Sequence, residues 1–132
     1  MNTDDFGKLV LRLMLGGLLL FHGIHKILTG IDPIREMVGA YHLPNYLAYG
    51  VYAGEVLAPV LLILGLFARI GGALVAINMI VAVLLVHTGM LLEIDGTGGY
   101  ALELQAFYLF SGLAVVLLGA GRYAIGGQGP LN

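Results

Sequence analysis

The sequence predicts an all-α integral membrane protein, a four-helix bundle with a short interfacial helix between the first two spans. Hydrophobic residues make up 59% of the 132 residues and charged residues only 11%, whereas soluble domains carry charge on about a quarter of their residues. The mean hydropathy is +0.95. So short a chain cannot hide this much apolar surface from water, and it holds about four spans of about 20 residues each. We therefore expect one domain over residues 1–132 with the lipid bilayer as its solvent.

The charge balance and the lack of cysteine exclude several classes of function. The net charge is -2 and there is no basic run, so we expect no nucleic-acid partner. Without cysteine, the chain forms no disulfide, no thiolate metal site and no thiol relay. The N-terminus is acidic before Lys8, and no small-residue cleavage site follows Phe21. It therefore does not resemble a signal peptide.

The first span is predicted over residues 8–28 and ends in ionisable side chains. Residues 13–21 carry no charge, but His22, His25 and Lys26 follow. Such groups are costly in hydrocarbon, so they usually face the protein interior and have a partner. The chain breaks at residues 29–31, and residues 33–41 are then predicted to form a short amphipathic helix at the membrane interface, with Asp32 as its N-cap and Pro33 as its first residue.

Three further spans are predicted over residues 46–67, 70–92 and 100–119. In the second span, Gly50 and Gly54 form a pair that lets another helix approach closely. Glu55 lies within the same span, and Pro59 is expected to kink it. The third span carries small packing residues over Gly71 to Ala73.

The basic residues predict the orientation of the bundle. Lys8, Arg12, Arg69 and Arg122 gather at one end, and the acidic residues Asp32, Glu36, Glu93 and Asp95 lie at the other. Because cytoplasmic loops of membrane proteins carry an excess of Lys and Arg, the first end is expected to be cytoplasmic. The prediction is a multi-pass protein of the cytoplasmic membrane with both termini inside. Arg12 lies near enough to its helix end to snorkel toward water.

All four predicted helices place ionisable or hydrogen-bonding side chains in the outer half of the bundle. The candidate site residues are His22, His25, Lys26, Tyr52, Glu55, His87 and Glu103. His22, His25 and Lys26 are spaced to share one helix face, and Tyr52 and Glu55 share another. Asn78 lies about half a turn from His87 in angle, so we assign it to an interhelical hydrogen bond outside the site. Gln105 lies off the Glu103 face.

This set of side chains admits several interpretations. In the simplest, Lys26 neutralises Glu55 or Glu103 and fixes the register of the helices. In the second, a quinone head group accepts hydrogen bonds from the histidines and the lysine. Its ring would lie in an apolar slot lined by Phe21, Tyr52 and Phe107. A haem or another metal ion is a third interpretation, although the sequence lacks an E-x-x-H pair. Proton or ion conduction is a fourth, although the inner half lacks a polar path.

Motifs along the four spans match the pattern of a known family. They are Leu11-Arg12-Leu13, Gly17, Phe21-His22-Gly23 and Lys26; Glu55 with Leu62 to Gly65 and Arg69; Val86-His87-Thr88; Gly99 to Glu103; and Gly119 to Tyr123. In order and spacing they resemble the DoxX family of small four-span membrane proteins. The resemblance implies a cytoplasmic-membrane protein linked to redox work, as in the quinone-reducing thiosulfate oxidoreductase of this family.

The resemblance also limits the electron path. Similar four-helix quinone-site proteins pass electrons through cysteines, which this chain lacks. The donor is then expected to be the substrate itself or a periplasmic or membrane redox partner. We expect a quinone-interacting or accessory subunit of a membrane oxidoreductase. The alternative is a non-enzymatic membrane scaffold or small-solute transporter with a purely structural polar cluster. A homo-oligomer and an activity of its own are both left open by the sequence.

Overall fold

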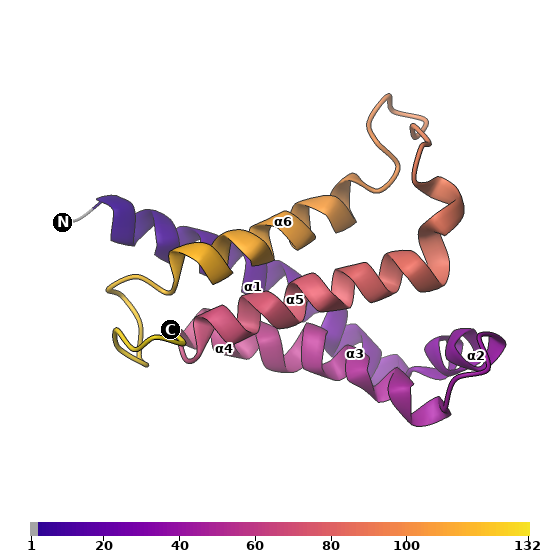
Figure 1. Ribbon diagram of the computed structural model, residues 1–132, viewed down its shortest axis with the longest axis horizontal. Coiled ribbons are helices and arrows are strands. Elements are labelled where there is room, and N and C mark those ends of the chain that lie inside the picture. The colour runs from indigo at the N-terminus through magenta and orange to yellow at the C-terminus, as the bar shows by residue number, and fades with distance from the viewer. Residues whose placement is uncertain (1–2) are drawn as a thin grey trace.

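The computed structural model describes residues 3–132, with their side chains except those of Val86 and His87. Over these residues the chain forms helices and loops, and its β-structure is limited to an isolated bridge between Ile94 and Tyr100. The long helices lie side by side in an elongated bundle (Figure 1). Three helical segments are long and apolar enough to cross a membrane, Thr3–Thr29, Asn45–Leu64 and Ala68–Leu85, and a shorter apolar helix covers Glu103–Leu118. The predicted all-α membrane fold is confirmed.

Helix α1 (Thr3–Thr29) begins earlier than the predicted span. Asp4 and Asp5 lie in its first turn, where negative charge favours the helix dipole. One stripe of the helix is buried, made of Arg12, Leu15, Gly16, Leu19 and Gly23. The helix ends at Gly30, which has a positive φ of 86° and donates its N–H to the Lys26 carbonyl at 2.8 Å. A glycine in this conformation is a common C-terminal cap.

Helix α2 (Asp32–Ala40) lies at the end of the bundle opposite to both termini (Figure 1). The prediction that Asp32 caps it is wrong, because Asp32 is its first residue and Ile31 precedes it without a side-chain cap. The Asp32 carboxylate instead accepts a hydrogen bond from Arg35 at 3.2 Å. The apolar face of α2 buries Val38 against Ala48 and neighbouring residues of the next helices, so the helix packs on the bundle as well as covering its end.

The second long segment changes its helical type along its length. A 3₁₀ turn, η1 (Asn45–Tyr49), is followed by α3 (Gly50–Tyr52), a π-helical turn η2 (Ala53–Leu57) and α4 (Ala58–Leu64). Pro59 has no N–H to donate to the carbonyl of Glu55 four residues earlier. The chain adopts the wider π turn before it, and Ala58 bonds back to Ala53. Where the sequence predicted a kink at Pro59, the structure has this π-helical turn just before it.

The third and fourth long segments are joined by an ordered loop. Helix α5 (Ala68–Ala82) continues through a π turn, η3 (Val83–His87), and a 3₁₀ turn, η4 (Thr88–Met90). Helix α6 (Glu103–Leu118) begins three residues later than predicted, because Tyr100 pairs with Ile94 in the loop. The Asp95 carboxylate accepts hydrogen bonds from Thr97 and Gly99 in this loop. Those to Thr97 contribute most to lowering the pKa of Asp95 from its ordinary value.

Glycines set the closest helix contacts. Where α5 crosses α6, a Cβ on Gly72 would lie 2.5 Å from the Gly112 carbonyl oxygen, and one on Gly112 would lie 2.7 Å from the Gly72 carbonyl oxygen. Of the predicted pair on the second span, Gly54 does receive a neighbour, the Asn78 side chain of α5. Gly50 does not, since a Cβ there would meet nothing within 4 Å. Of these two glycines, only Gly54 therefore lies at a close contact with α5.

The C-terminal segment, residues 120–132, folds back over the end of the bundle that holds both termini (Figure 1). Ile125 donates its backbone N–H to the Leu64 carbonyl at 3.1 Å, just where α4 ends. The Asn132 side-chain oxygen accepts the N–H of Ala68, the first residue of α5, at 2.9 Å. The segment thus satisfies backbone groups that the helix ends leave free.

Arg12 does not snorkel toward water, and that prediction is wrong. Its side chain is only 1% exposed. One terminal nitrogen donates to the Leu62 carbonyl at 2.8 Å, and the other donates to the Tyr123 carbonyl. Backbone carbonyls at the end of α4 and in the C-terminal segment thus replace water at the two terminal nitrogens, whereas Nε is buried without a hydrogen-bond partner among the described residues.

Replacing Gly72 with Ala is expected to lower the free energy of unfolding by about 1–3 kcal/mol, the usual cost of overpacking a tight contact. The new Cβ would force α5 and α6 apart. The matched control is Gly17→Ala on α1, where a Cβ meets nothing within 4 Å. It is expected to be neutral or slightly stabilising, because Ala favours helix over Gly. Unfolding in a denaturing detergent measures both variants, and equal midpoints would contradict the close crossing.

Candidate functional site

An ion pair joins α1 to the second long segment. The ammonium of Lys26 donates to one oxygen of the Glu55 carboxylate. The Glu55 side chain is 7% exposed and that of Lys26 is 26% exposed, so the carboxylate is buried and the ammonium lies at the edge. Of the two carboxylates that the sequence offered to Lys26, the structure pairs it with Glu55.

The backbone around Glu55 explains how the two helices come so close. Because Pro59 lacks an N–H, the Glu55 carbonyl loses its ordinary helical donor. Gly23 of α1 packs directly against that carbonyl, and a Cβ there would overlap it. Lys26 follows Gly23 by three residues, so it lies on nearly the same face of α1 and reaches the Glu55 side chain. Glycine, proline and the π turn together place the ion pair.

A third helix completes the environment of the carboxylate. The Asn78 amide on α5 donates to the other Glu55 oxygen at 3.3 Å. The expected interhelical hydrogen bond of Asn78 is therefore present, but it joins the site from which sequence reasoning excluded it. The Tyr52 hydroxyl donates to the Lys26 carbonyl at 3.4 Å. We call these four residues, Lys26, Tyr52, Glu55 and Asn78, the polar cluster.

Two of the three predicted histidines, His22 and His25, have described side chains. His22 is exposed, and its ring meets Tyr108 of α6 edge to face, with 6.2 Å between the ring centroids and 86° between the planes. His25 is also exposed, and at about 100° per residue it lies about 160° around the helix from Gly23. The side chain of His87 lies outside the described residues, so its place in the site stays a prediction.

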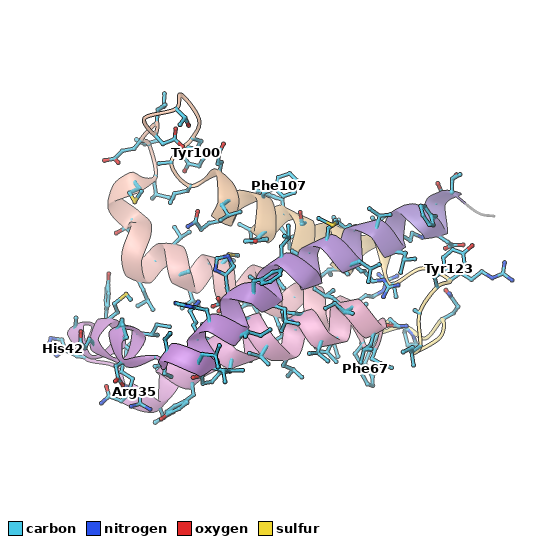
Figure 2. The ribbon with its side chains drawn as sticks, turned by 180° about the vertical axis from the view of Figure 1, so that it is seen from behind. Arg35, His42, Phe67, Tyr100, Phe107 and Tyr123 are labelled. Atoms are coloured by element: carbon cyan, nitrogen blue, oxygen red, sulfur yellow. The ribbon has the colours of Figure 1, made fainter. Side chains whose placement is uncertain are left out.

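Glu103 lies apart from the polar cluster. It is the first residue of α6, and its side chain is exposed. It borders an open, mainly apolar groove of about 470 Å³ along α6, and Phe107 lines the same groove. Phe107 is 74% exposed and projects from the bundle (Figure 2). Glu103 and Phe107 therefore share one face of α6, and that face is turned outward.

Tyr108 is the residue of this region that sequence reasoning missed. It is 7% exposed and belongs to the main apolar core. The signal lay in the spacing, because Tyr108, Gly112 and Val115 recur at helical intervals and are the buried residues of α6.

The described side chains near the ion pair offer hydrogen-bond donors. Among residues 3–132, leaving aside the side chains of Val86 and His87, no group of three or more histidines and carboxylates could hold a metal ion. Lys26 has three donors, of which Glu55 occupies one. His22 is an exposed imidazole one turn away on α1. Together they offer hydrogen-bond donors to a carbonyl or an anion.

Comparisons with known proteins agree with the fold and bear on this region. The DoxX family model matches residues 7–88. A protein of Bacillus subtilis (strain 168) named "Putative oxidoreductase CatD" is 34% identical over 85 residues, which cover 64% of this chain and 63% of that relative. The chain thus matches less than two thirds of that relative's length. No solved structure matches the chain. The family match includes the whole polar cluster but ends before α6 and Tyr108.

Replacing Glu55 with Ala leaves Lys26 unpaired and is expected to destabilise the bundle by roughly 3–5 kcal/mol. Glu55→Gln is expected to cost less, because an amide oxygen still accepts from Lys26 and Asn78. The control is Glu103→Gln, since Glu103 is exposed and should tolerate the change. Thermal unfolding in one detergent compares the three variants. Equal, small shifts in all of them would show that the Glu55 pair contributes nothing to folding.

Proposed function

The chain belongs to the DoxX family of membrane proteins, and on that premise we propose that it is a quinone-interacting or accessory subunit of a membrane oxidoreductase. The polar cluster carries the proposal. A lysine and a carboxylate within a span are more costly than apolar packing, so ionisable residues there are functional candidates. The oxidoreductase name of the Bacillus subtilis relative is in keeping with this class of function.

The side chains near the cluster suit a quinone head group. Reduction of a quinone takes two electrons and two protons, and its carbonyl oxygens become better hydrogen-bond acceptors as electron density arrives. Cationic and N–H donors therefore favour the reduced form. Lys26 retains donors beyond the one given to Glu55, and the His22 imidazole is exposed. His22 and Lys26 are the residues that would hold the quinone oxygen.

The electrons need a source outside this chain. The sequence holds no cysteine, so no thiol relay passes electrons through it. We propose that a reduced substrate or a periplasmic or membrane redox partner supplies them. The role of this chain is then to hold the acceptor and to manage protons.

A second candidate is a non-enzymatic scaffold or a small-solute transporter. One observation favours it: both oxygens of Glu55 already have donors, in Lys26 and Asn78. A carboxylate whose two oxygens are both paired can serve only to fix helix register. The two candidates differ in whether the exposed donors of His22 and Lys26 bind anything.

The quinone proposal is tested by titrating the detergent-solubilised protein with a short-chain quinone, followed by intrinsic fluorescence and melting shift. His22→Ala is expected to weaken the response. Lys26→Met should weaken quinone binding further than His22→Ala does. Loss of a hydrogen bond from a charged group raises the Kd by about tenfold or more. Lys26→Met is made together with Glu55→Gln, which avoids leaving a buried carboxylate unpaired, and Glu55→Gln alone is the control for that change.

His25→Ala is the matched control, because His25 is exposed on the same helix and lies about 160° around it from Gly23, whereas His22 lies about 100° and Lys26 about 60° from Gly23. It should leave the titration unchanged. Two results would remove this region from the redox proposal: no saturable response in the wild-type protein, or wild-type affinity in both the His22 and the Lys26 variants. In either case, the structural candidate is retained.

We further propose that the protein lies in the cytoplasmic membrane with both termini in the cytoplasm. The basic residues Lys8, Arg69 and Arg122 lie at the end that holds the termini, as the positive-inside tendency requires. Since the chain has no cysteine, single cysteines can report the topology. In intact cells a membrane-impermeant maleimide should label Gly96→Cys in the α5–α6 loop and spare Gly129→Cys in the C-terminal segment. Both glycines have open space around them. The opposite labelling would invert the orientation.

A further inference from the structure

We infer that Tyr108 is a positioning residue of the proposed site, and that it holds the His22 imidazole in place for a ligand. This inference rests on the proposed function for the identity of that ligand. Tyr108 comes from α6, a helix that holds none of the four residues of the polar cluster. Its ring meets that of His22 edge to face, with the centroids 6.2 Å apart and the planes at 86°. Aromatic pairs prefer this arrangement.

The surroundings of the two rings differ, and that difference assigns their roles. Tyr108 is 7% exposed and belongs to the core cluster with Leu19 and Met79, so packing from other helices fixes its ring. His22 is exposed and would otherwise be free to change its rotamer. Because the Tyr108 ring is fixed by packing and the His22 ring is not, Tyr108 limits the orientations of His22 and not the reverse. The cost of ordering His22 is then met during folding and not at binding.

The contact also links α6 to the helix that carries the ion pair. His22 lies four residues before Lys26, on the same face of α1, and Lys26 pairs with Glu55. The proposed site therefore draws on α1, α3, η2, α5 and α6.

Three variants separate the ring of Tyr108 from its hydroxyl and from its part in the core. Tyr108→Leu removes the aromatic ring, and Tyr108→Phe keeps the ring but removes the hydroxyl. Val115→Ala is the matched control for packing, because Val115 is a core residue of α6, 1% exposed and seven residues away. All three are compared with the wild-type full chain in the same detergent.

The first measurement needs no ligand. Histidine-labelled protein gives imidazole resonances by NMR, and those of His22 are assigned by their absence in His22→Ala. They should move in Tyr108→Leu, which loses the ring current, and remain near their wild-type positions in Tyr108→Phe and Val115→Ala. If His22 is unmoved in Tyr108→Leu, or moves as much in Val115→Ala, then Tyr108 does not position it and the inference is wrong.

The second measurement is the short-chain quinone titration. Tyr108→Leu should weaken the response by about two- to tenfold, the range that loss of one aromatic pair implies. Tyr108→Phe should restore most of it. Val115→Ala should lower the melting temperature without changing the Kd. A Phe variant as weak as the Leu variant would overturn the role of the ring. A wild-type protein without a saturable response would overturn the proposed function, and the NMR result alone would then decide the positioning of His22.

Discussion

The arrangement of the site depends on one missing hydrogen-bond donor, that of Pro59. Because the proline cannot bond to the Glu55 carbonyl, the helix opens into a π turn and leaves that carbonyl facing α1. Only a residue without a side chain can pack there, and the chain has Gly23 at that point. The close approach brings Lys26 within reach of Glu55, and Asn78 then satisfies the second carboxylate oxygen. Each step needs the one before it.

Sequence reasoning could predict the fold because hydropathy and helix length report on the bilayer directly. It could also place Lys26 opposite a carboxylate, since helix depth follows from counting residues. It excluded Asn78 from the site and did not single out Tyr108. An ideal helix has 3.6 residues per turn, but a π turn inserts an extra residue that rotates everything after it by about 100°. Asn78 and His87 are separated by such a turn, Val83–His87.

Other errors have a different cause. Arg12 was expected to reach water because the sequence does not reveal that residues 120–132 return to cover that end of the bundle. Glu103 was expected to face inward because its spacing from Phe107 shows that they share a face but not which way that face points. Periodicity defines a stripe on a helix, and only packing decides its direction. Tyr108, on a neighbouring stripe of the same helix, is the one that points into the core.

The buried guanidinium of Arg12 has a consequence for how the protein is made. Its two acceptors belong to Leu62 and Tyr123, the second of them 111 residues further along the chain. The first helix therefore enters the bilayer with a cation whose final partner has yet to be translated, and an unsatisfied charge at that depth is unfavourable. Until residue 123 reaches its place in the bundle, water, lipid headgroups or the insertion machinery must take the position of the Tyr123 carbonyl beside Arg12. The last segment of the chain therefore completes the hydrogen bonding of a side chain in the first helix.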